Sequence, residues 1–192
     1  MPAAVRAETV AVLDACVLLP ASLRDTLLRL AETPPLYSPR WSDQIWVEVK
    51  RNLESRRKLT PQKIAHLVEQ VELHFPEART EGYEKLSLLM TNHPKDRHVA
   101  AAAVKSGAQF IVTSNLKDFP SASLEKWKIE VRHPDGFLIY LYTRHPEEVA
   151  SRLRDQAATI GRTLPDVLRT LRAGVPKFAA MVAAELGLII AD

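Results

Sequence analysis

The sequence predicts an α/β domain with a mostly parallel sheet, followed by a helical extension. Short β-type runs alternate with helical segments, which is the pattern of a parallel sheet with crossover helices. The first run is β-branched and apolar without alternation, as in a strand covered on both faces. From Pro134 onward every segment has helical spacing. We therefore expect an α/β domain over residues 1–144 and a helical extension over 145–192.

The composition is that of an ordinary globular protein. The chain has 192 residues, of which 46% are hydrophobic and 26% charged, so one domain with a small appendage can bury a substantial core. A net charge of +3 permits a polyanionic partner but does not by itself indicate one. The single cysteine, Cys16, excludes an internal disulfide and is typical of a reducing compartment. We expect Cys16 to pack as a small apolar side chain rather than act as a nucleophile.

Neither a leader nor a membrane span is expected. The N-terminal "MPAAVRAETV" has no apolar core long enough for a signal peptide. The most apolar stretch, "FAAMVAAELGLIIA", is shorter than the roughly 20 residues that a span needs and contains Glu185. These features predict a soluble protein of the cytoplasm.

The first half of the chain alternates one strand with several helices. Residues 9–13 ("TVAVL") predict the first strand, and 22–32 predict a helix that ends before Pro34–Pro35. A second helix, capped near Ser42, carries a four-residue stripe of inward positions, and a third begins at Thr60–Pro61.

The second half supplies two more strands and the helical extension. Residues 95–106 predict an alanine-rich helix that Gly107 ends. Residues 109–113 ("QFIVT") and 128–132 ("KIEVR") predict strands. Four prolines in the last third of the chain fit helix starts, where a missing N–H is harmless: Pro134, Pro146, Pro165 and Pro176.

Asp14 directly follows the first strand, where two interpretations compete. It can cap the next helix, or it can belong to a site, since ligands gather at the carboxyl ends of strands in an open parallel sheet. Ser114 and Asn115 follow the 109–113 strand at the same edge.

Two further acids lie on inward faces of predicted helices. Glu48 adjoins the buried stripe of its helix, where a carboxylate needs either a positive partner or an exit to solvent. Asp96 heads the inward face of the alanine-rich helix, although a first-turn Asp also fits simple capping. Asn115 and Asp118 lie in the loop after the 109–113 strand, where turn formation is the alternative.

Taken together, these side chains predict a cation site. Carboxylate and amide oxygens with few histidines and no further cysteine suit Mg²⁺ or Mn²⁺ rather than Zn²⁺. The cation would relieve the repulsion between crowded carboxylates, position a water molecule and stabilise phosphate charge.

Four segments in this order resemble the PIN-domain family of metal-dependent ribonucleases: "VLDACVLLP", "WVEVKRNL", "PKDRHVAAAAV" and "FIVTSNLKDFP". The resemblance covers roughly residues 9–142. It implies a Rossmann-like three-layer α/β/α fold and Mg²⁺- or Mn²⁺-dependent cleavage of single-stranded RNA. The family is best known from the toxins of bacterial toxin–antitoxin pairs, which implies a small antitoxin protein as partner, and a homodimer is compatible with it.

The resemblance also assigns roles to residues. Asp14 matches the first metal-ligating Asp, Glu48 the acid on the helix and Asp96 the third acid. The fourth acidic position falls on Asn115, where many members carry Asp, so the second half of the metal site departs from the family pattern. Asp118, in the same "NLKDFP" signature, can supply the missing charge.

Several nearby side chains remain open to two interpretations. A basic run on or beyond the Glu48 helix can follow a phosphate backbone or form a solvated helix end: Lys50, Arg51, Arg56, Arg57 and Lys58. His93 and His98 flank Asp96 and allow a role beside the site, but we favour surface or helix-start positions. Thr113 and Ser114 either hydrogen-bond the site or simply end the strand.

The leading hypothesis is a PIN-type endoribonuclease, and two alternatives are weighed against it. A PIN-fold module with a weakened site that binds RNA or protein is kept open by Asn115 and opposed by the other acids. An aspartyl phosphotransferase of the dehalogenase type needs an acid two residues after the first Asp, where this chain has Cys16. A nucleotide-binding loop lacks support because the chain has only six glycines.

Overall fold

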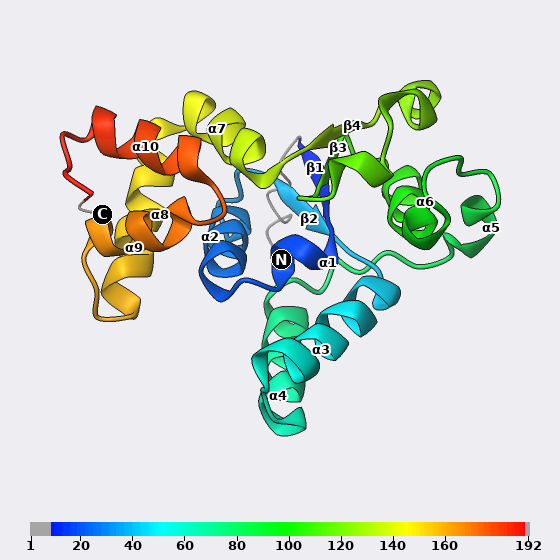
Figure 1. Ribbon diagram of the computed structural model, residues 1–192, viewed down its shortest axis with the longest axis horizontal. Helices are drawn as coiled ribbons and strands as arrows, with labels where there is room; N and C mark the ends of the chain where they lie inside the picture. The colour runs from blue at the N-terminus through cyan, green and yellow to red at the C-terminus, as the bar shows by residue number, and fades with distance from the viewer. Residues whose placement is uncertain (1–8, 191–192) are drawn as a thin grey trace, which may run out of the picture.

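The computed structural model describes residues 9–190, and within them a four-stranded, all-parallel sheet forms the centre (Figure 1). The strand order is β2-β1-β3-β4. The strands are β1 (Val10–Leu13), β2 (Ser38–Arg40), β3 (Phe110–Val112) and β4 (Glu130–Arg132). The expectation of no signal peptide falls largely on residues 1–8, which lie outside the described residues. The predicted α/β class with a parallel sheet is confirmed.

Helices cover both faces of this sheet and continue into the C-terminal region. They are α1 (Ala15–Leu18), α2 (Ala21–Ala31), α3 (Asp43–Arg57), α4 (Pro61–His74), α5 (Glu84–Ser87), α6 (Arg97–Ser106), α7 (Pro134–Arg144), α8 (Pro146–Thr159), α9 (Leu164–Arg172) and α10 (Pro176–Glu185). Short 3₁₀ turns complete the loops: η1 (Pro94–Asp96), η2 (Leu116–Asp118), η3 (Ser121–Ser123) and η4 (Glu125–Trp127).

The strand β2 was not expected from the sequence. It contains Pro39, which pairs in register with Ala11 of β1. A proline cannot donate to a sheet ladder, so a proline argues against a central strand. Here β2 is an edge strand with a partner on one side only, and the missing N–H is harmless.

The alanine-rich helix α6 packs flat on the sheet. Ala100, Ala101, Ala102 and Ala103 are fully buried, and the helix contacts β1, β2 and β3. Small side chains permit this close approach, and Gly107 ends the helix with a positive φ of 65°. Because α6 runs antiparallel to the strands, its N-terminus lies at the carboxyl edge of the sheet.

The pair α3 and α4 projects from the sheet near α1 (Figure 1). Ser42 caps α3 by accepting a hydrogen bond from the Ile45 N–H, and Thr60 caps α4 in the same way from Lys63. Both caps agree with the sequence prediction. The stripe of inward positions on α3 is buried, which fixes the rotation of the helix and points Glu48 toward α6: Ile45, Val49 and Leu53.

The C-terminal helices gather at one end of the molecule around α2 and α7 (Figure 1). Pro134, Pro146 and Pro176 are the first residues of their helices, and Pro165 is the second. Helix α7 contacts both β4 and α10, so it joins the sheet to the extension. The boundary at residue 145 stays a proposal. Within residues 9–190, no helix is long and apolar enough to cross a membrane.

Candidate metal centre

Asp14 leaves β1 at the carboxyl edge and is held by three donors. Its Oδ1 accepts a hydrogen bond from the Ala15 N–H at 2.7 Å, which caps α1. Its Oδ2 accepts from the Thr113 hydroxyl at 2.6 Å and from the Cys16 thiol at 3.2 Å. Asp14 is therefore a helix cap, and it is also tied to the end of β3. Thr113 contacts the site rather than only ending its strand.

The Cys16 thiol donates a hydrogen bond to Asp14 and is not activated as a nucleophile. Burial, followed by the charge of Asp14, raises the pKa of Cys16 to about 12. The thiol therefore keeps its proton at neutral pH, which excludes a thiolate nucleophile at this position.

Asp96 lies in the last residue of η1, at the N-terminus of α6, and is only 4% exposed. It makes no capping hydrogen bond to the helix, and its Oδ2 has no hydrogen-bond partner. Burial above all, with smaller contributions from the charges of Asp14 and Asp118, raises the pKa of Asp96 to about 6 in spite of the opposing charge of Lys95. A buried carboxylate oxygen without a donor is costly, so the capping interpretation does not account for Asp96.

Asp118 approaches Asp96 from the loop after β3. The Asn115 side-chain amide donates a hydrogen bond to Asp118 Oδ2, and this contact lowers the pKa of Asp118. When Asp96 keeps its proton, a hydrogen bond joins the two carboxyl groups. Neighbouring carboxyl groups whose pKa values are driven in opposite directions are a common feature of functional sites.

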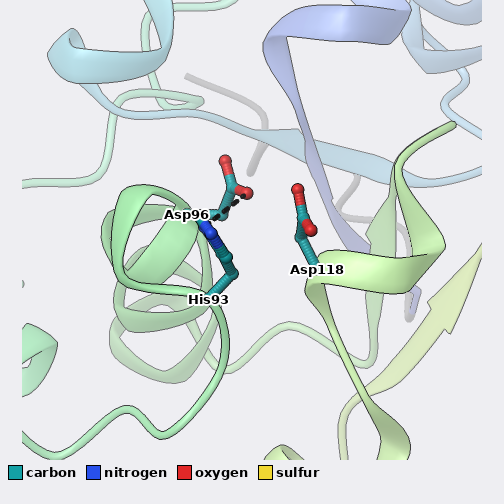
Figure 2. A group of neighbouring side chains, drawn as sticks. All are labelled: His93, Asp96 and Asp118. Atoms are coloured by element: carbon teal, nitrogen blue, oxygen red, sulfur yellow. Dashed lines mark ion pairs between the residues drawn. The ribbon is translucent and has the colours of Figure 1, made fainter.

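His93 completes a group with these two acids. Figure 2 shows the carboxylates of Asp96 and Asp118 next to each other, with the His93 ring beside Asp96. His93, Asp96 and Asp118 each bring a ligand atom within 4.8 Å of the other two. His93 Nδ1 lies 3.9 Å from Asp96 Oδ2, too far for a hydrogen bond. Both histidines lie at helix starts, as favoured, and His93 also takes the position beside Asp96 that was kept open for it.

Glu48, on α3, contacts a second histidine, on α6. His98 Nε2 lies 3.2 Å from Glu48 Oε1. His98 is buried at 5% exposure, so a surface position for it was wrong. The carboxylate of Glu48 is 22% exposed and thus keeps access to solvent. The charges of Glu48 and Asp14 both act on His98 and oppose the lowering of its pKa by burial.

Comparisons with known proteins identify the family of this chain. Residues 10–117, more than half of the chain, match the family model described as the PIN domain. The chain belongs to the PIN-domain family. Residues 134–184 of this PIN-domain protein match the VapC50 C-terminal domain.

One relative of this PIN-domain protein comes from Mycobacterium tuberculosis strain H37Rv and carries the name "Putative ribonuclease VapC50". The two chains are 42% identical over 102 residues, which is 52% of this chain and 60% of the relative. The chain thus covers less than two thirds of the relative's length.

The residues at the carboxyl edge of this PIN domain fit a divalent cation. Asp96 and Asp118 approach each other directly, and Asp14 acts on Asp96 through its charge. The side-chain amide nitrogen of Asn115 donates to Asp118 Oδ2. The orphaned Oδ2 of Asp96 is the kind of buried acceptor that a cation satisfies. The sequence named the acids as candidates and left the roles of His93, His98 and Thr113 open, and the fold supplies their contacts.

Proposed function

We propose that this PIN-domain protein is an endoribonuclease that depends on Mg²⁺ or Mn²⁺ and hydrolyses phosphodiester bonds of single-stranded RNA. The observation that carries the proposal is the unpartnered, buried Oδ2 of Asp96 facing Asp118 in a member of this family. A buried acid without a donor destabilises the fold, so its presence is best explained by a bound cation.

Each acid has its own part in this proposal. Asp96 and Asp118 would hold the cation directly, and Asp14 and Glu48 would complete its oxygen ligands. A bound divalent cation supplies positive charge for the phosphate and lowers the pKa of a coordinated water. Thr113 keeps Asp14 in place, and Asn115 does the same for Asp118, so that the negative charges stay aimed at one position.

The RNA would approach over the exposed edge beside α3. Glu48 is on this helix, and the basic side chains that follow it are all exposed: Lys50, Arg51, Arg56, Arg57 and Lys58. Such side chains neutralise phosphates without reading sequence. The run therefore supports binding of a nucleic acid, while the base preference of cleavage needs other contacts.

We place the protein in the cytoplasm as the toxin of a toxin–antitoxin pair, with a small antitoxin protein as partner. The family and the similarity to a relative named as a ribonuclease VapC50 support this role. A homodimer is part of the same proposal. Co-expression with the product of an adjacent small reading frame should restore growth that this chain alone arrests.

The direct test measures cleavage of single-stranded RNA by the purified protein. We expect cleavage with Mg²⁺ or Mn²⁺, none in chelator, and a loss of about 100-fold or more in Asp96→Asn, because one ligand charge is removed with little change in volume. Asp155→Asn, an exposed position on α8, is the matched control. RNA binding without cleavage under all these conditions would favour the alternative, a PIN-fold binding module.

A further inference from the structure

We infer that His93 is itself a ligand of the cation site, which makes the site a mixed nitrogen and oxygen site that takes Mn²⁺ or another first-row transition ion in preference to Mg²⁺. The inference rests on the proposed function and adds a residue and a metal class to it. The acids that match the family pattern are all oxygen donors, and His93 is not among them.

The geometry of three ligand atoms carries the inference. Two are carboxylate oxygens, of Asp96 and Asp118, and the third is a ring nitrogen of His93. All lie within 4.8 Å of one another, and Nδ1 is 3.9 Å from Asp96 Oδ2. Octahedral ligands at about 2.1 Å from an ion are separated by about 3.0 Å when adjacent and about 4.2 Å when opposite. The group is therefore already close to the size of a coordination shell.

A second observation points to an ion rather than to a surface cluster of charges. Asp96 is 4% exposed, and its Oδ2, the oxygen nearest His93, has no hydrogen-bond partner. The His93 ring, with Nδ1 3.9 Å from this oxygen, stands beyond hydrogen-bond distance. The empty acceptor is aimed into the space that the three side chains share.

The backbone fixes these residues relative to one another. The His93 N–H donates to the Asp118 carbonyl at 3.0 Å, and the Asp96 N–H donates to the His93 carbonyl at 2.9 Å. Pro94 follows His93 and restricts it to an extended conformation, with φ −51° and ψ 130°. The side chain of His93 makes no capping bond to η1, so capping does not explain its orientation. Ligands placed in advance in this way lose little entropy on binding an ion.

The chemistry of the donors then selects the metal. Mg²⁺ prefers oxygen ligands and water, whereas imidazole favours transition ions, with affinity increasing from Mn²⁺ to Co²⁺ and Ni²⁺. An imidazole in place of an oxygen ligand therefore strengthens binding of Mn²⁺ and adds little for Mg²⁺. The carboxylates of Asp96 and Asp118 keep the site hard enough for Mn²⁺.

The test uses the full-length metal-free protein, without RNA, and Mn²⁺ as the probe. Pulsed EPR of bound Mn²⁺ should show modulation from a directly coordinated ¹⁴N nucleus, and this signal should disappear in His93→Gln. Titrations should show the Kd for Mn²⁺ rising about tenfold in His93→Gln while the Kd for Mg²⁺ changes less than about twofold. The exposed His66 on α4 provides the matched control, His66→Gln, which should leave both values unchanged.

Other results would overturn the inference. A ¹⁴N signal that survives in His93→Gln but is lost in His98→Gln would show that His98, and not His93, coordinates the ion. Equal loss of Mn²⁺ and Mg²⁺ affinity would show that His93 does not select the metal. RNA cleavage by a protein whose bound Mn²⁺ shows no ¹⁴N signal would contradict the role of His93 and leave the proposed ribonuclease activity intact. Protein that binds no divalent ion would remove the inference and the proposed function together.

Discussion

The imidazole of His98 meets the carboxylate of Glu48, with Nε2 3.2 Å from Oε1. Burial lowers the pKa of His98, so the ring is neutral at neutral pH and contacts the carboxylate through an N–H at Nε2. Its other nitrogen, Nδ1, has no hydrogen-bond partner. Burying a polar ring with only one hydrogen bond lowers the stability of the fold. We infer that His98 is kept because it fixes the orientation of Glu48.

His98→Phe should therefore weaken the metal site more than the fold. Phenylalanine fills the space of the ring but donates no hydrogen bond, so Glu48 is free to rotate to solvent. We expect the Kd for Mn²⁺ to rise about tenfold, with a similar loss of RNA cleavage. His98→Gln keeps a donor and should recover part of both. Equal behaviour of the two variants would show that His98 only fills space.

The hydrogen bond from Thr113 to Asp14 tests the orientation of a carboxylate without changing its charge. Thr113→Val keeps the shape of the side chain and removes the hydroxyl that donates to Asp14 Oδ2 at 2.6 Å. We expect a loss of about 1–2 kcal/mol in unfolding free energy, measured in urea, and about tenfold lower cleavage. Thr143→Val, at an exposed position of α7, controls for the change in side-chain type.

Asp14→Asn should remove most cleavage while the protein stays folded, because the charge is lost and the volume is kept. The amide also loses one acceptor, so we expect about 1 kcal/mol lower stability. Circular dichroism and cleavage assays on the same preparations separate the two effects. Undiminished cleavage would mean that Asp14 acts only as the cap of α1.

Helices in this chain were predictable because their signals are local. Ser42, Thr60 and the prolines at helix starts mark boundaries by chemistry within one turn. β2 lacked such a signal, since Pro39 is acceptable only at a sheet edge and edge position depends on the strand order. The four-residue helices α1 and α5 were missed because one turn carries no periodicity.

The candidate site likewise combines residues that the local sequence predicts with contacts that only the fold determines. Asp14, Asp96 and Asp118 were identifiable because they follow a strand or head a helix, and Glu48 because it adjoins the buried stripe of its helix. The contact between His98 and Glu48 joins residues 50 positions apart, on different helices. Spacing indicates that a residue faces inward, but it does not indicate what it meets across the sheet edge. Asn115 was weighed as a replacement for an acid, whereas its amide is a donor to Asp118.

The carboxylate of Asp135 attaches the start of α10 to α7. It lies in the first turn of α7 and accepts hydrogen bonds from the Phe178 N–H at 2.7 Å and the Lys177 N–H at 3.2 Å. Asp135→Ala should lower the unfolding free energy by about 1–2 kcal/mol, as for the loss of a helix cap. Asp135→Asn keeps an acceptor and should cost less. If both variants unfold like the parent protein in urea, apolar packing alone holds α10.

The loop after β3 offers a test of the fourth acidic position. Asp118→Ala removes one of the carboxylates in the group with Asp96, and we expect the Kd for Mn²⁺ to rise at least tenfold. Asn115→Asp removes the amide donor that lowers the pKa of Asp118 and adds a negative charge beside it. In chelator this variant should therefore be less stable, and Mn²⁺ should restore its stability. Unchanged Mn²⁺ affinity in Asp118→Ala would leave Asp118 with a role in the turn alone.

Asp96 predicts a pH dependence whose sign differs between the metal-free and metal-bound protein. Its pKa is about 6 in the folded chain against an ordinary value of 3.8, so the folded state holds the extra proton between these values. Stability of the metal-free protein therefore falls as the pH rises from about 4 to about 6. Asp96→Asn escapes this loss and should be more stable at pH 7, by about 1 kcal/mol because solvent on the His93 side screens the charge.

At pH 4 most of the difference between the two proteins should be gone, because Asp96 then keeps its proton in the folded state and is only about half ionised in the unfolded state. With Mn²⁺ the parent protein should be more stable than Asp96→Asn at pH 7, because the bound cation stabilises the folded state by mass action. The cation displaces the proton of Asp96, so both Mn²⁺ affinity and cleavage should decline below about pH 6. Thermal unfolding from pH 4 to 8, in chelator and in Mn²⁺, measures both trends, with Asp155→Asn as the exposed control. A parent protein that is more stable than Asp96→Asn in chelator at pH 7 would show that the buried carboxylate of Asp96 carries no penalty for a cation to relieve.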